Sequence, residues 1–184
     1  HAGAGTFDLP LNIAPGTGSL VSVEPRALGA GHLIVFTFDE PVTGPGVVTA
    51  LDAGNAPIGN IAMPIVMGNT VHVVVANVPD RRRVKVTLTG VSGASGVTNA
   101  SVSIGFLIGN FNDSGSVSVQ DSAAAKSRSG QLVDFNSFRF DVNTSGRVSA
   151  SDIATTKSRM GLTVVTNALP LKWNQGGWNL DLWQ

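Results

Sequence analysis

Short apolar runs separated by turn residues fill the chain from Gly18 to Leu107. The run His-Leu-Ile-Val-Phe-Thr-Phe at 32–38, for example, ends at Asp-Glu-Pro. Such runs recur at roughly the 8–12-residue spacing typical of a β-sandwich or barrel, and no segment with a helical period interrupts them. The pattern predicts an all-β domain over residues 18–107, preceded by an N-terminal extension over 1–17. The expected strands are residues 20–23, 32–38, 47–51, 61–63, 71–75, 84–88 and 102–106.

Two stretches of this region resemble bacterial Ig-like domains. Residues 23–42 contain Val-Glu-Pro followed by Leu-Ile-Val-Phe-Thr-Phe-Asp-Glu-Pro-Val, which is similar to the opening of such domains. Residues 87–96, Thr-Leu-Thr-Gly-Val-Ser-Gly-Ala-Ser-Gly, resemble the hairpin near their end. The resemblance implies an Ig-like β-sandwich.

After Gly109 the chain contains an internal repeat. Residues 112–130 match residues 143–161 at 11 of 19 positions with an offset of 31, whereas ordinary composition gives about one or two matches by chance. The connection Phe106-Leu107-Ile108-Gly109 leaves no room for a flexible linker, so we expect the two halves to pack together.

Each repeat opens with a 12-residue stretch that has the pattern of a calcium loop. Positions 1, 3, 5 and 12 offer side-chain oxygens, position 6 is glycine, and position 7 offers its backbone carbonyl. The first loop has one ligand carboxylate and the second has two, so we expect two Ca²⁺ sites with the 141–152 site the stronger. The alternative is a pair of Asx or Ser-Gly turns that only cap helices. The expected ligands are Asn110, Asn112, Ser114, Ser116 and Asp121 in the first loop, and Asp141, Asn143, Ser145, Arg147 and Asp152 in the second.

A helix is predicted after each loop, over residues 119–128 and 150–159. Both segments end in Lys-Ser-Arg-x-Gly, which places cations and a glycine where a helix C-terminus favours them. No helical pattern precedes either loop. Each unit is therefore predicted to be a loop followed by one helix.

Residues 108–163 resemble a type I dockerin, the duplicated module that binds cohesin domains in cellulosomes and related bacterial assemblies. The motifs that carry the resemblance are Phe140-Asp141-Val142-Asn143 and the Asp and Lys-x-Arg after each loop. Asn110 at position 1 and serine at both positions 5 depart from the usual aspartates. The resemblance implies a small all-α calcium module of the F-hand type and a partner-facing surface, while the alternative for the basic residues is helix capping. The implied cohesin-binding residues are Val119, Gln120, Lys126, Ser127 and Arg128, with Ala150, Ser151, Lys157, Ser158 and Arg159.

Composition narrows the possible partners. The 12 basic and 12 acidic residues cancel, and charged residues make up 13% of the chain against about 25% in ordinary soluble proteins, so nucleic acid is not an expected partner. No cysteine is present, which excludes disulfides and thiolate metal sites. No apolar run reaches the length of a membrane span. We expect a secreted bacterial protein that works outside the cell or at its surface.

Other candidate residues have structural alternatives. Asp39-Glu40 is interpreted as a turn rather than an acid–base pair, and His32 and His72 as structural residues. The tail over residues 164–184 contains Trp173, Trp178 and Trp183, which either stack on sugar rings or lie against the protein itself.

The sequence thus predicts a mixed fold of two modules: an all-β Ig-like sandwich at 18–107 and a small all-α dockerin-like module at 108–163. The expected function is non-catalytic, calcium-dependent docking to a cohesin, with the sandwich as spacer. Two alternatives stay open: a carbohydrate-binding accessory region, and the C-terminal part of a secreted enzyme.

Overall fold

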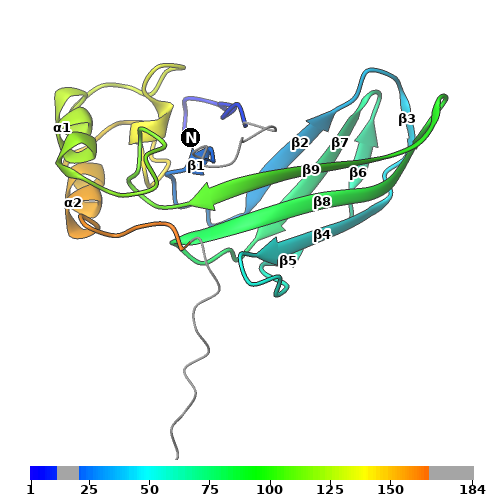
Figure 1. Ribbon diagram of the computed structural model, residues 1–184. Helices are drawn as coiled ribbons and strands as arrows, with labels where there is room; N and C mark the ends of the chain where they lie inside the picture. Colours follow the sequence, from blue (N-terminus) through cyan, green and yellow to red (C-terminus); the bar gives the residue numbers. More distant parts are fainter. Residues whose placement is uncertain (12–20, 166–184) are drawn as a thin grey trace, which may run out of the picture.

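The computed structural model describes residues 1–11 and 21–165, and within them two β-sheets stand beside a smaller end that carries two short helices (Figure 1). All strand pairs are antiparallel except β1–β9, which is parallel. The first sheet has the order β1 (Val23–Glu24), β9 (Gly96–Phe106), β8 (Arg82–Gly93), β3 (Val42–Gly44), with β4 (Val47–Asp52) also paired to β8. The second has the order β2 (His32–Thr37), β7 (Thr70–Ala76), β5 (Asn60–Ile61), with β6 (Ile65–Met67) also paired to β7.

The main core lies between the two sheets and follows from the alternation of side chains along each strand. Val71, Val73 and Val75 of β7 are fully buried, and so are the alternate residues of β8 that begin at Val84. Because successive side chains of a strand point to opposite faces, one apolar set per strand is enough to build this core.

The helical end contains α1 (Val119–Ser127), the 3₁₀ turn η1 (Phe138–Phe140) and α2 (Ala150–Ser158). The two α-helices lie next to each other at the end of the molecule opposite the tip of the β8–β9 hairpin (Figure 1). Each begins at a serine N-cap with an aspartate at its third position, a capping box. Both predicted helices are therefore present, within one residue of the expected ends.

The predicted fold class, a sandwich joined to an all-α module, is nevertheless wrong. The described residues are mostly β-sheet with two nine-residue helices, and a C-terminal all-α module is not seen. Helices this short cannot enclose a core by themselves. The small core at this end takes Phe111, Val142 and Val148 from loops and Phe140 from η1. Bridges such as Ser116–Thr163 join the loops to each other.

A third apolar cluster joins the helical end to the sheets. Val23 of β1, Leu107, Val117 and Val164 pack together and are all buried, and Leu107 is fully so. The last described residue, Val165, forms a parallel bridge with Arg82 at the start of β8. The helical end is therefore built onto the first sheet.

Ion pairs reinforce the same junction. The Arg139 guanidinium donates two hydrogen bonds to the Asp113 carboxylate, at 2.7 and 3.0 Å, and Asp113 also accepts the backbone N–H of Val23 at 2.7 Å. On the other side, Arg159 Nε lies 3.4 Å from the Asp80 carboxylate. Asp113 of the first repeat thus binds β1, and Arg159 of the second repeat pairs with Asp80, which lies between β7 and β8.

Leu107→Ala tests this junction. Removing a fully buried leucine is expected to lower the free energy of unfolding by about 2–5 kcal/mol, measured by urea denaturation. The matched control is Leu132→Ala, because Leu132 is 69% exposed; it should change stability by no more than about 0.5 kcal/mol. Equal effects of the two variants would show that Leu107 does not join the halves.

Candidate metal centre

The two predicted calcium loops have the same backbone conformation. Asp113 and Thr144, both at position 4, have φ of 57°. Gly115 and Gly146, both at position 6, have φ of 75° and 91°, in the left-handed region that only glycine adopts without strain. The repeat in the sequence is therefore also a repeat in the structure.

The aspartate at position 12 closes each loop. Asp121 is 1% exposed; its Oδ1 accepts the N–H of Phe111 at 2.8 Å, and its Oδ2 accepts the N–H and hydroxyl of Ser118 at 2.9 Å each. Asp152 is fully buried and binds the Ser149 N-cap in the same way. Each aspartate thus ties the start of its loop to the start of its helix.

In the second loop, position 1 is a fully buried hydrogen-bond acceptor. Asp141 Oδ1 accepts the N–H of Ser145 at 2.9 Å and its hydroxyl at 3.2 Å, and Oδ2 accepts the N–H of Gly146 at 2.7 Å. Backbone N–H and hydroxyl donors thus surround this carboxylate, which also pairs with the His1 ring. Burying its charge is costly unless such partners or a cation balance it.

In the first loop, the same position is a donor. Asn110 is fully buried, and its Nδ2 donates to Asn112 Oδ1 at 3.2 Å, Ser114 Oγ at 2.9 Å and the backbone oxygen of Ser116 at 2.7 Å. The side chains of positions 1, 3 and 5 therefore meet with the carbonyl of position 7, as the sequence predicts. In this loop, however, the side chain at position 1 turns its N–H groups, and not its oxygen, toward the oxygens of positions 3, 5 and 7.

The N-terminal segment covers the second loop, a contact for which the sequence gives no signal. His1 Nδ1 donates to Asp141 Oδ2 at 2.8 Å, and the N–H of Ala2 donates to Thr144 O at 2.9 Å. A Cβ at Gly146 would collide with the carbonyl oxygen of Ala2. Glycine at position 6 is therefore required twice here, for its φ and for the close approach of the N-terminal segment.

The donor chemistry of the second loop fits Ca²⁺, a hard cation that binds oxygen ligands. Among the described residues, Asp152 forms no ion pair, and Asp141 pairs with the His1 ring alone, at 2.8 Å. The described residues also contain no group of three His, Asp or Glu side chains that could hold a metal. An ion in this loop would therefore depend on Asn, Ser and backbone oxygens beside the two carboxylates.

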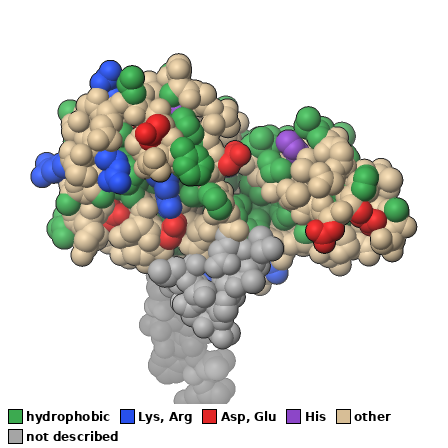
Figure 2. Space-filling view, turned by 90° about the horizontal axis from the view of Figure 1, so that it is seen from above, with side chains coloured by type: hydrophobic (Ala, Val, Ile, Leu, Met, Phe, Trp, Pro, Cys, Tyr) green, Lys and Arg blue, Asp and Glu red, His purple; other side chains and the backbone are tan. Residues whose placement is uncertain are grey.

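Most predicted partner residues are exposed on the helices, but the two arginines are not free. Arg128 lies over the Phe140 ring, 4.0 Å from its centroid, and Arg159 faces Asp80. On the face shown in Figure 2, most visible Lys and Arg side chains lie over this end of the molecule. The exposed predicted residues are Val119, Gln120, Lys126 and Ser127 on α1, with Ala150, Ser151, Lys157 and Ser158 on α2.

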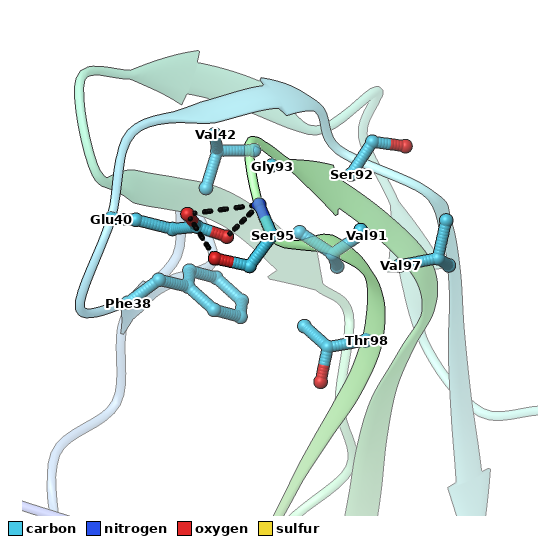
Figure 3. A pocket seen from close by; sticks show the side chains of 10 residues that line it. Phe38, Glu40, Val42, Val91, Ser92, Gly93, Ser95, Val97 and Thr98 are labelled. Atoms are coloured by element: carbon cyan, nitrogen blue, oxygen red, sulfur yellow. Dashed lines mark hydrogen bonds between the residues drawn. The ribbon is translucent and has the colours of Figure 1, made fainter.

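Glu40 has a structural position rather than a catalytic one. Its carboxylate accepts the N–H of Ser95 at 3.1 Å and the Ser95 hydroxyl at 2.8 Å, at the tip of the β8–β9 hairpin (Figure 3). A Cβ at Gly93 would lie 2.5 Å from Glu40 Oε1. Glu40 therefore binds the tip of the β8–β9 hairpin to the turn that precedes β3.

Two groups outside the loops have shifted pKa values. Burial lowers the pKa of His32, whose ring packs edge-on against Phe106 at 4.6 Å, and whose Nδ1 has no hydrogen-bond partner. The Ser137 hydroxyl lowers the pKa of Asp134, which precedes η1. His72 bonds Thr70 Oγ1 through Nε2 at 3.0 Å. None of these three residues belongs to either predicted calcium loop.

Neither a protein-family model nor a curated protein matches this chain. In the described part of the chain, no helix is both long and apolar enough to cross a membrane. Trp173, Trp178 and Trp183 lie outside the described residues, so the two interpretations of the tail stay predictions.

The closing role of the aspartates can be tested without metal. In chelator, Asp121→Ala and Asp152→Ala should each lower the free energy of unfolding by about 1–3 kcal/mol, because buried N–H groups lose their acceptor. Asp39→Ala, on the exposed turn, is the control and should have little effect in the same denaturation experiment. A wild-type stability for both loop variants in chelator would contradict this role.

Proposed function

We propose that the two loop–helix repeats form a calcium-dependent docking surface for a cohesin domain, and that this chain has no catalytic role of its own. The observation that supports it best is the second loop, where Asp141 and Asp152 are fully buried and accept hydrogen bonds from serine hydroxyls and backbone N–H groups. A bound cation would balance the two buried charges.

In the second loop, the side chains of Asp141, Asn143, Ser145 and Asp152 and the backbone carbonyl of Arg147 would hold the ion. Calcium supplies two positive charges there and no reaction chemistry. Since the Asp152 carboxylate also binds Ser149, the N-cap of α2, fixing this carboxylate fixes the start of that helix. Calcium would thus order the helix surface that the partner contacts.

The two helices offer similar surfaces to a partner. Positions 1, 2, 5, 8 and 9 are exposed in both α1 and α2, and the exposed lysines Lys126 and Lys157 are 31 residues apart. Lysine, serine and small side chains dominate these positions, so a partner with acceptor groups fits them. The sheets serve as a spacer that holds this surface at one end of the molecule.

Calcium should stabilise the full chain. At free calcium about 100 times the dissociation constant, the free energy of unfolding should rise by about 2.7 kcal/mol, and excess chelator should reverse the gain. Thermal melting followed by circular dichroism measures it. Magnesium at the same concentration is the control, because it demands a smaller, more rigid site. Identical melting with calcium and with chelator would refute the calcium part of the proposal.

Charge reversal on the helices tests the docking part. Lys126→Glu and Lys157→Glu together should weaken binding to a responsive member of a panel of cohesin domains by about 10-fold or more, measured by calorimetry with calcium present. Lys85→Glu, at an exposed position on β8, is the matched control and should bind like the wild type. If each single variant keeps most of the affinity, either helix can serve the partner. A panel with no binder would refute the docking proposal.

A further inference from the structure

We infer that the first loop needs no calcium, because the side-chain amide of Asn110 occupies the place and the role that a cation has in such a loop. The protein then binds one calcium ion, in the second loop. The count of one rests on the proposed function; the role of Asn110 does not.

The amide hydrogens of Asn110 lie where the ligands of an ion converge. Nδ2 is 3.2 Å or less from an oxygen of each of positions 3, 5 and 7. The Ser116 carbonyl can only accept hydrogen bonds, so Nδ2, and not Oδ1, must face it. The inner oxygens of the loop are therefore satisfied by a group of the chain itself.

The remaining groups of the first loop leave little for an ion. Position 1 faces the inner oxygens with Nδ2, while Asn110 Oδ1 is buried and accepts no hydrogen bond. The one ligand carboxylate, Asp121, has both oxygens bound to the N–H groups of Phe111 and Ser118. An entering ion would have to displace the amide and would gain a single negative charge.

The second loop has the opposite polarity at the same position. Asp141 has no hydrogens to donate and accepts from His1, Ser145 and Gly146, whereas Asn110 donates. The other loop contacts agree: Ser114 N–H donates to Asn112, and Ser145 N–H donates to Asn143, both at 3.1 Å. The identity of one residue, Asn or Asp at position 1, therefore separates a self-closed loop from a cation site.

Calorimetric titration of the chelator-stripped full chain with calcium chloride tests this inference. The wild type should bind one ion, Asn110→Asp should bind two, and Asp141→Asn should bind none while keeping its circular dichroism spectrum. Asn112→Asp is the matched control, because it adds the same charge to the same loop and keeps the Asn110 amide; it should still bind one ion. In chelator, Asn110→Asp should melt below the wild type, and calcium should restore it.

The outcomes separate the inference from the proposed function. No ion in the wild type and one in Asn110→Asp would refute the calcium function and keep the role of Asn110. Two ions in the wild type, or no gain in a folded Asn110→Asp, would overturn the inference. Asn110→Ala gives a second measurement: it should lower the melting temperature equally with and without calcium, and a loss seen only with calcium would make Asn110 a ligand.

Discussion

The structure of the helical end depends on two buried carboxylates that must find all their hydrogen bonds inside the protein. Asp121 and Asp152 each accept from a backbone N–H at the start of a loop and from the serine that caps the following helix. A buried carboxylate without such donors is costly, so the two ends of each loop have to meet. The left-handed residues at positions 4 and 6 then follow, because the chain must reverse within twelve residues.

The two repeats share the hydrogen bonds that close each loop and differ in their contacts with the rest of the molecule. At position 4, the first repeat has Asp113, which pairs with Arg139 and β1, whereas the second has Thr144, which binds the N-terminal segment. At the helix ends, Arg128 lies on an aromatic ring and Arg159 pairs with Asp80. The exposed surfaces of α1 and α2 are thus similar, although the contacts that hold the two helices differ. A partner that contacts only the exposed surfaces would meet two similar sites.

Local patterns predicted the local structure well. The short connection at 106–109 also predicted that the two halves pack together, but not which residues make the contacts. The offset of 31, the aspartate at position 12 of each loop and the terminal glycines located both loops and both helices. The separate all-α module was wrong because most of residues 108–163 are loops that pack on each other and on β1, and pairs such as Asp113–Arg139 or Arg159–Asp80 leave no periodic signal. Strands β8 and β9 also run far beyond the predicted apolar cores, through Thr, Ser and Asn residues that face solvent. The donor role of Asn110 was not predicted, because asparagine carries both a donor and an acceptor and only the geometry distinguishes them.

Attachment to the sheets would give the proposed docking surface a fixed direction. β1 pairs with β9, while its Val23 accepts a hydrogen bond from Arg139 and donates one to Asp113, so the first loop and the sheet share one strand. A flexible linker would let the helices sample many directions, and the entropy lost on binding would reduce affinity. Here that orientation is set when the chain folds, by Leu107 and its buried neighbours. The first loop is bonded to the shared strand through Asp113. If it closes on its own amide, the start of α1 would be maintained without calcium, while calcium in the second loop would order the start of α2.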